Sequence, residues 1–449
     1  MQAGHFDEAE RLLRTLCARS GADSQTWFLL GYLQGKRGDA ASAESCFRKA
    51  LARKPKFIQA QFNLGIALRD QGRLDEARIE LVDVVTTQPD HAEAHNALGC
   101  ILLRLARQDD AEHCFRNALA SNPMLLEALN NLGGILLSLQ QWLEAATLSR
   151  RALSIAPGNT LAALNLGRAL VGMDQLEEAL PFCRQAVAGN PKNPMVHTVM
   201  GGLLRKLGRI EEAKKSFQTV LEIATNHGEA RHALAILDGG SSQSVAPVEY
   251  VTELFDGYAD SFDAHLVEKL QYNVPELLEK AIREALGQRS NLDVLDLGCG
   301  TGLCGLLIKP MSRSLAGVDL SPKMVAKARE RAVYDELEVG ELIGSLSRRA
   351  RELDLVLAAD VFVYIGDLSH VFDAVAKALR ANGLFAFSVE TATEGEGDMY
   401  TLRCTGRYAH AHNYVTALTN RFGFKLVFQE RIDVRLGIPG AIYLLQCRS

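Results

Sequence analysis

The stretch VLDLGCGTG, residues 294–302, decides the fold of the C-terminal half of this chain. It begins as a short apolar strand that carries one acidic residue, Asp296, and it ends in the alternate glycines Gly298, Gly300 and Gly302. Glycine lets a backbone turn sharply and pass close beneath a ligand, because it has no side chain. A strand, a glycine turn and a helix that follows at once predict a loop for a nucleotide-type cofactor.

Short apolar runs alternate with helical stretches on both sides of this loop. The expected strands are Leu292–Leu297, Ser314–Val318, Leu353–Ala358, Leu384–Val389, Lys425–Gln429 and Ala441–Gln446. Alternation of this kind predicts an α/β domain, a mostly parallel sheet with helices on both faces. In such sheets a ligand lies past the carboxyl ends of the central strands.

Two carboxylates indicate which cofactor the loop binds. Asp319 ends the second expected strand, where it can accept hydrogen bonds from both hydroxyls of a ribose. The GxGxxG of residues 300–305 also admits a nicotinamide enzyme as an alternative. Asp296 argues against that alternative, because a carboxylate beneath the loop would repel a dinucleotide pyrophosphate. It would instead attract the cationic amino end of S-adenosylmethionine (SAM).

The string VLDLGCGTG, followed by GVDLSPKMVAKAR from Gly317, resembles the Rossmann-like class I SAM-dependent methyltransferase fold. The resemblance implies that Glu341 meets the adenine amino group, and that residues 354–364 and 384–390 are the fourth and fifth strands with their turns. The resemblance also implies that Asp360 lies at the cofactor crevice. The other expected cofactor contacts, beside those already named, are Cys299, Leu320 and Leu342.

The first half of the chain repeats with a period of 34 residues. Six glycines keep this spacing from Gly31 to Gly201, and five prolines keep step with them from Pro55 to Pro191. A glycine inside a helix costs about 1 kcal/mol relative to alanine, so its recurrence indicates close packing at each position. The units, which predict antiparallel helix pairs stacked into a solenoid, begin at Ser24, Ile58, Ala92, Leu126, Thr160 and Pro194.

This period resembles the tetratricopeptide repeat, and the whole chain resembles a bacterial family of tetratricopeptide-repeat-containing class I methyltransferases. We therefore expect a multidomain protein with an all-α superhelix over residues 1–238: a half repeat, six full repeats and a capping helix. A Gly/Ser-rich linker, 239–249, would lead to the methyltransferase domain, 250–449. Within that domain, residues 250–290 would supply lid helices.

The lid is expected from FDGYADSFD, residues 255–263, because a helix at this place folds over the cofactor in related methyltransferases. Tyr258 is the candidate for contacting the methionyl end of the cofactor. The alternative is that Phe255, Tyr258 and Phe262 only pack on the sheet.

The sequence offers fewer signals for the residues that would bind and activate the methyl acceptor. His410 and His412 are the expected bases, with His370 and His265 as weaker candidates and a structural role as the alternative for each. Further residues expected around the acceptor are Glu390 and Tyr364, for the chemical step, and Arg407 and Tyr408, to read a substrate carboxylate or backbone. The missing Asn-Pro-Pro-Tyr after the fourth strand argues against the amide and adenine N-methyltransferases that use this motif.

Asn63, Asn131 and Asn165 share one position on the first helix of their repeats. A row of asparagines like this one grips peptide backbone in the repeat array of O-linked N-acetylglucosamine transferases. An amide suits that role because it offers a donor and an acceptor. Ala97 and Val199 interrupt the row, and the alternative is that the amides bond within the groove wall.

The composition of the chain limits the kinds of partner that it can bind. The net charge of −5 argues against a dedicated nucleic-acid binder, and no apolar run reaches the ~18 residues of a membrane span. The nine cysteines are scattered without a CxxC pair, so we expect free thiols in the cytoplasm and no metal. These observations predict a SAM-dependent methyltransferase, with a homo-oligomer left open, whose repeats recruit a protein or peptide substrate. A small-molecule methyltransferase with repeats used for assembly and a non-catalytic scaffold are the alternatives.

Overall fold

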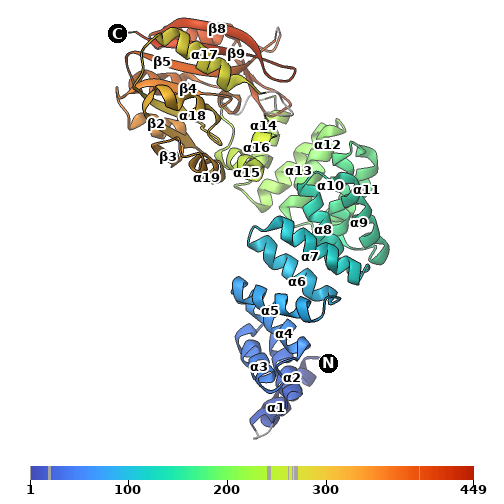
Figure 1. Cartoon of the computed structure of the whole chain (residues 1–449). Helices are drawn as coiled ribbons and strands as arrows, with labels where there is room; N and C mark the ends of the chain where they lie inside the picture. Colours follow the sequence, from blue (N-terminus) through green and yellow to red (C-terminus); the bar gives the residue numbers. More distant parts are fainter. Residues whose placement is uncertain are drawn as a thin grey trace. The chain divides into compact units, whose positions relative to one another are not determined.

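The computed structural model describes residues 2–18, 22–239, 244–260, 262–264, 266, 272–393 and 395–448. The chain divides into two compact units, Met1–Arg209 and Ile210–Ser449 (Figure 1).

The first unit is helical throughout its described residues, and its helices keep the 34-residue period. The helices are α1 (Gln2–Ala18), α2 (Ser24–Lys36), α3 (Ala40–Arg53), α4 (Ile58–Asp70), α5 (Leu74–Thr87), α6 (Ala92–Arg104), α7 (Gln108–Ser121), α8 (Leu126–Ser138), α9 (Trp142–Ile155), α10 (Thr160–Gly172), α11 (Leu176–Gly189) and α12 (Pro194–Lys206). The first helix of every repeat begins at the residue that the periodicity predicts. Figure 1 shows these helices stacked pair after pair.

The repeated glycines lie where two helices of a pair come closest. A β-carbon added at Gly99 would lie 2.7 Å from the ring of Phe115, and one at Gly65 would lie 2.8 Å from Leu81. Gly133 differs, because the nearest atom to an added β-carbon there would be the amide nitrogen of Asn165 at 3.4 Å. The small Ser149 stands opposite Gly133, so the close approach is relaxed in this repeat.

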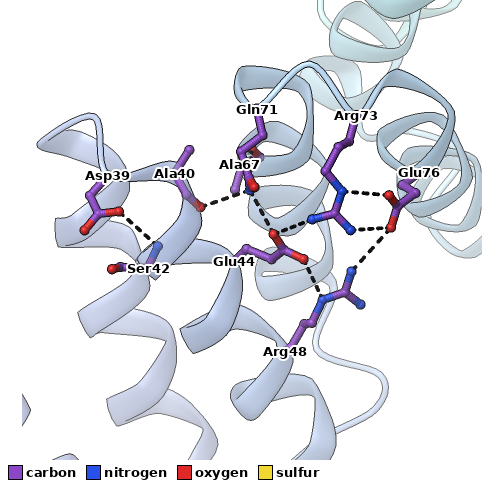
Figure 2. Close-up of polar contacts among 9 residues, drawn as sticks. All are labelled: Asp39, Ala40, Ser42, Glu44, Arg48, Ala67, Gln71, Arg73 and Glu76. Atoms are coloured by element: carbon purple, nitrogen blue, oxygen red, sulfur yellow. Dashed lines mark hydrogen bonds and ion pairs between the residues drawn. The ribbon is translucent and has the colours of Figure 1, made fainter.

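Polar contacts join neighbouring repeats (Figure 2). Glu44 on α3 accepts hydrogen bonds from Gln71 at 2.9 Å and from Arg73 at 2.7 Å, both at the α4–α5 turn. Arg73 also pairs with Glu76, and Arg48 pairs with Glu44. Such exposed pairs add little to stability, because solvent screens the charges. The array is therefore held mainly by its apolar helix faces.

The second unit begins with helices α13 (Ile210–Ile223), α14 (Gly228–Leu237), α15 (Val248–Tyr258), α16 (Phe262–Ala264) and α17 (Val274–Leu286). Its strands are β1 (Leu292–Leu297), β2 (Ser312–Asp319), β3 (Glu336–Val339), β4 (Leu353–Ala358), β5 (Leu379–Thr391), β6 (Tyr400–Leu402), β7 (Tyr408–His410), β8 (Phe424–Arg435) and β9 (Ile438–Cys447). The elements between the strands are α18 (Leu303–Ile308), η2 (Lys309–Met311), α19 (Pro322–Glu330), α20 (Leu342–Ser347), η3 (Phe362–Tyr364), α21 (Ser369–Ala378) and α22 (His412–Arg421).

The sheet has the order β3-β2-β1-β4-β5-β7-β6, and β3 through β5 are parallel. Strand β9 runs antiparallel to β5 and to β8. Successive side chains of β4 face opposite sides: Val356 packs with α21 and α22, whereas Leu355 packs with α17. The predicted α/β architecture with helices on both faces is confirmed, and all six expected strands are present.

Helix α14, which the sequence assigns to the repeat array, packs within the second unit. Ala235 lies in one apolar cluster with Leu402 and Tyr408. The Nε2 atom of His232 lies 2.9 Å from the carbonyl oxygen of Gly406, and its ring stacks on Tyr250. The compact unit therefore starts at Ile210, and the domain boundary after residue 238 stays a prediction.

Candidate functional site

A cavity of about 320 Å³ lies at the carboxyl ends of the central parallel strands. One wall is the turn after β1 together with the residues that follow β2, β3 and β4. The other wall is the segment from Val245 to Phe262. This is the edge at which an open α/β sheet places its ligand.

The turn after β1 requires its glycines. Gly298, Gly300 and Gly302 have φ angles of +62°, +53° and +92°, in the left-handed region that favours glycine. A β-carbon at Gly298 would also lie 2.6 Å from Val361. Gly298, Cys299 and Gly300 line the cavity, whereas Gly302 is the residue from which α18 starts.

Asp319 stands beside this turn at the end of β2. Its carboxylate accepts hydrogen bonds from the backbone N–H of Gly300 at 2.9 Å and of Ser321 at 2.8 Å. Burial raises the pKa of Asp319, and these two hydrogen bonds lower it in part. The side chain is thus held in place at the cavity before any ligand is present.

Asp296 lies beneath the turn and is 1% exposed. The hydroxyl of Tyr334 donates a hydrogen bond to it at 2.7 Å. Burial raises the pKa of Asp296 to about 7, although the Tyr334 hydrogen bond opposes this change. A cationic ligand group in the cavity would favour the ionised form. Tyr334 could not be expected from sequence, because it is 38 residues from Asp296 and carries no motif of its own.

The same half of the cavity contains Leu320, Glu341 and Leu342, as the sequence predicts for the cofactor. Among the described residues that line the cavity, the arginine and lysine side chains are Arg407 and Arg435 alone. Arg407 directly precedes β7 and Arg435 ends β8, so neither comes from β1, β2 or β3. The half beside β1, β2 and β3 is therefore acidic. It fits a ligand with an adenosine and a cationic tail, as SAM has.

Residues 244–260 and 262–264, called the cover from here on, form one wall of the cavity. Val245 forms a β-bridge with Ile365, and the N–H of Ala246 donates to the carbonyl oxygen of Tyr364 at 2.9 Å. The rings expected to form a lid, Phe255, Tyr258 and Phe262, line the cavity and touch one another edge to face. Burial raises the pKa of Tyr258.

Carboxylates fasten this cover to the glycine turn and to α19. Asp256 accepts a hydrogen bond from the Ser321 hydroxyl at 2.5 Å. Asp263 accepts one from the Thr301 hydroxyl and pairs with Arg331. In FDGYADSFD, only the aromatic residues were predicted to have a role. The spacing of its aspartates, which place acidic groups on one side of the segment, was the signal for these contacts.

The far half of the cavity is built on a buried charge cluster. Arg435, which is 4% exposed, pairs with Asp360 at 3.0 Å and with Glu390 at 2.5 Å. Arg403 also pairs with Glu390, at 3.2 Å. Asp360 and Tyr364 line the cavity. Glu390 belongs to the same cluster but does not line the cavity. Burial raises the pKa values of Asp360 and Tyr364.

The two histidines expected as bases lie elsewhere. His410 is fully buried, and its Nε2 contacts the carbonyl oxygens of Ile365 and Gly366 at 2.9 and 3.1 Å. Burial lowers the pKa of His410 to about 4. The Nδ1 of His412 lies 3.0 Å from the Tyr443 hydroxyl, outside the cavity lining. Neither position suits a base, because neither ring reaches the cavity.

The remaining acceptor candidates divide in the same way. Arg407 and His370 line the cavity, whereas Tyr408 is buried in the apolar cluster with Ala235. His265 lies outside the described residues.

The three asparagines of the array have different surroundings. The amide nitrogen of Asn63 donates to the carbonyl of its own helix at Gln59, and that of Asn131 donates to Asn96. Asn165 is 3% exposed and donates to the carbonyl of Asn130 in the preceding repeat. Asn165 therefore joins two repeats. A grip on peptide stays a prediction for the half-buried Asn63 and Asn131.

The described part of the chain contains no group of three or more His, Cys, Asp or Glu side chains placed to hold a metal ion. No described helix is both long and apolar enough to cross a membrane.

Comparison with known families agrees with the two kinds of fold. Residues 294–383 match the family model described as a methyltransferase domain. Residues 28–92 and 96–160, and in a second model 136–203 and 170–237, match the tetratricopeptide repeat. The chain thus carries tetratricopeptide repeats and a methyltransferase domain of the SAM-dependent kind. This assignment excludes the nicotinamide alternative.

Curated relatives match the methyltransferase part. The chain is 30% identical to a malonyl-[acyl-carrier protein] O-methyltransferase of Acetivibrio thermocellus over 139 residues, which are 30% of this chain and 47% of that protein. It is 28% identical to a ubiquinone biosynthesis O-methyltransferase of Pelagibacter ubique, over 23% of this chain and 44% of that protein. The chain thus spans less than half the length of each of these two relatives. Among solved structures, it resembles YrrB, a tetratricopeptide-repeat protein with an unusual peptide-binding site, with 21% identity and a TM-score of 0.37 over 42% of this chain and 96% of that one.

Proposed function

We propose that this protein is a SAM-dependent methyltransferase whose repeat array recruits a protein or peptide acceptor. The observation that carries the enzymatic part is the acidic half of the cavity. There, a turn of left-handed glycines stands between the buried carboxylate of Asp296 and the half-buried carboxylate of Asp319. When bound, SAM supplies a methyl group on a positively charged sulfur.

Each residue of this half has a proposed task. Asp319 binds the ribose hydroxyls, Glu341 the adenine amino group, and Asp296 attracts the ammonium group of the cofactor tail. Phe255 and Tyr258 on the cover helix exclude water from the reacting groups. The far half, with Asp360 and Tyr364, receives the acceptor.

The recruitment part has separate support. Tetratricopeptide repeats stack into an extended surface of the kind that binds other proteins. Asn63 and Asn131 stand on the first helices of their repeats, where their amides are half-buried rather than enclosed. This part of the proposal concerns the choice of acceptor and does not affect cofactor binding.

A second candidate is a methyltransferase for a small or carrier-bound acceptor, in which the repeats serve assembly. The matched relatives favour it, since their names refer to malonyl-[acyl-carrier protein] and to ubiquinone biosynthesis. The two candidates share one cofactor site and differ in what the array does.

Calorimetry of the full chain with S-adenosylhomocysteine tests the enzymatic part. We expect Asp319→Ala to weaken binding by at least about tenfold, because two charge-assisted hydrogen bonds are lost. The matched control Asp433→Ala removes an exposed carboxylate and should bind like the wild type. The absence of binding to the wild type, as a non-catalytic scaffold would show, contradicts the proposal.

Transfer of labelled methyl groups in a lysate, separated into macromolecular and small-molecule fractions, tests the recruitment part. The full chain should label a polypeptide. A chain of residues 210–449, cut where the second compact unit begins, should bind S-adenosylhomocysteine but lose that labelling. Equal labelling by both chains contradicts recruitment, and label found only in small molecules favours the second candidate.

A further inference from the structure

The two halves of the cavity differ in charge. On one side, Asp296 lies near the end of β1, Asp319 ends β2, and Glu341 follows β3. The two lining arginines come from the other side, Arg407 from the residue before β7 and Arg435 from the end of β8. The strand order therefore separates a half suited to a cation from a half that contains guanidinium groups.

Arg435 is already neutralised. It is 4% exposed, and its terminal nitrogens contact Asp360 and Glu390 at 3.0 and 2.5 Å. The buried Glu390 and the half-buried Asp360 thus share one buried arginine, with Arg403 adding a second contact to Glu390 at 3.2 Å. Removing a buried charge from such partners is costly, so Arg435 has a structural task.

Arg407 is placed differently. Its side chain is 33% exposed and lines the cavity, and the Glu390 carboxylate is 3.9 Å away. The charge of Asp360 also acts on Arg407, but the closer partner of Asp360 is Arg435 at 3.0 Å. Glu390 has closer partners in Arg435 and Arg403. The other polar contact of the Arg407 guanidinium is a hydrogen bond with Tyr364, which also lines the cavity. The positive charge of Arg407 is consequently the least compensated in this half.

The backbone holds Arg407 in this place. The N–H of Arg403 donates to the Arg407 carbonyl at 2.9 Å, which closes a tight turn. Gly406 in that turn has a φ of +81°, and its carbonyl contacts the buried His232 of α14. The turn fixes the backbone, and the hydrogen bond with Tyr364 orients the guanidinium, so Arg407 loses less freedom when it binds a ligand.

On the basis of the proposed function, we propose that Arg407, together with Tyr364, binds a carboxylate group of the methyl acceptor. A guanidinium fork suits the two oxygens of a carboxylate. A monoanion fits better than a phosphate dianion, because Asp360 and Glu390 would repel the second negative charge. The apolar side chains of Val245, Val248 and Ile365 on the cavity wall suit the aliphatic part of such an acid.

Butyrate and its neutral analogue butyramide test this inference as probes of equal shape. Their binding to the full chain, saturated with S-adenosylhomocysteine, is followed by ligand-observed NMR. We expect the wild type to bind butyrate at least about tenfold more tightly than butyramide, since hydrogen bonds to a charged group are the stronger ones. Equal binding of the acid and the amide by the wild type overturns the inference.

Variants assign the preference to one side chain. Arg407→Gln should abolish the preference for the acid, and Arg407→Lys, which keeps the charge but loses the fork, should keep part of it. The matched control Arg421→Gln removes an exposed arginine on α22 and should behave like the wild type. An unchanged preference in a folded Arg407→Gln protein overturns the inference. If this variant does not fold, a preference in Arg407→Lys equal to that of the wild type overturns it instead.

The cofactor has a carboxylate of its own, and a second comparison separates the two sources. S-adenosylhomocysteine contains this carboxylate, whereas 5′-methylthioadenosine lacks it. We expect Arg407→Gln to change the affinity for neither by more than about twofold. A tenfold loss for S-adenosylhomocysteine alone would assign Arg407 to the cofactor and overturn the inference. The absence of S-adenosylhomocysteine binding by the wild type would instead contradict the proposed function.

Discussion

The two units of this chain are built from contacts of different range. In the repeats, Gly99 meets Phe115 and Gly65 meets Leu81, so each close contact joins residues 16 positions apart. In the second unit, the charge cluster beside the cavity joins Asp360, just after β4, to Arg435 on β8, 75 positions away. A substitution in the array should therefore act on one repeat, whereas one in the cluster should act on several strands at once.

The largest expected effect comes from breaking the long-range cluster. Arg435→Met leaves Asp360 and Glu390 buried without their main partner and should lower the free energy of unfolding of the second unit by about 3–5 kcal/mol. Hydrogen exchange at the amides of β4 and β5 measures this loss. Arg431→Met, which removes an exposed arginine on the same strand, is the control. A loss below about 1 kcal/mol in Arg435→Met would mean that the cluster is not a single unit.

The next effect concerns the short-range contacts. Gly99→Ala forces a methyl group into the ring of Phe115 and should destabilise the array by about 2 kcal/mol. Gly133→Ala, at the same place in the next repeat, has room and should stabilise it by up to about 1 kcal/mol through better helix propensity.

Urea unfolding followed by tryptophan fluorescence measures both glycine variants, because the two tryptophans of the chain, Trp27 and Trp142, lie in the first unit. Equal effects of the two substitutions would show that the spacing of the helices does not depend on the residue opposite the glycine.

A smaller effect is expected from pH at the cofactor half. Burial raises the pKa of Asp296 to about 7, so its carboxyl is mostly protonated at pH 6 and mostly ionised at pH 8. A cationic ligand prefers the ionised form. The affinity for S-adenosylhomocysteine should therefore rise about tenfold from pH 6 to pH 8, with uptake of ligand accompanied by release of a proton.

Calorimetry in buffers of different ionisation enthalpy measures that proton release. Asp296→Asn should bind more weakly at pH 8 and lose the pH dependence. If this variant keeps the pH dependence, the titrating group is a neighbour such as Asp319 rather than Asp296.

The smallest effect is expected at the cover. Asp263→Asn weakens its contacts with Thr301 and Arg331, which are partly exposed and together contribute about 1 kcal/mol. S-adenosylhomocysteine should then dissociate about threefold faster in a stopped-flow experiment. Glu253→Gln, on the exposed side of α15, should leave the rate unchanged. Equal rates in all three proteins would mean that the contacts of Asp263 do not limit ligand exit.

Local patterns predicted most of the fold. The repeat starts from Ser24 to Pro194, the glycine turn and Asp319 at the end of β2 all lie where the sequence places them. The strands missed were β3, β6 and β7, which are four, three and three residues long. Strands this short have no apolar run that periodicity can detect.

Some residues of the site could be predicted from local patterns, and others could not. The residues expected at the cofactor lie at or near strand ends, so Asp296, Glu341 and Asp360 could be named in advance, and all three line the cavity. His410 could not be assigned, because a histidine beside a conspicuous motif has the same appearance in sequence whether it faces a cavity or, as here, the carbonyls of Ile365 and Gly366.

By itself, the sequence determined a stack of helical repeats and a methyltransferase domain, because both depend on residues that are close together along the chain. Only the tertiary structure decided which groups share the cavity. It buried His410, used Arg435 to neutralise Asp360 and Glu390, and left Arg407 lining the cavity. The physical reason is that burial and charge pairing depend on which distant strands become neighbours, and the order of the sheet sets this.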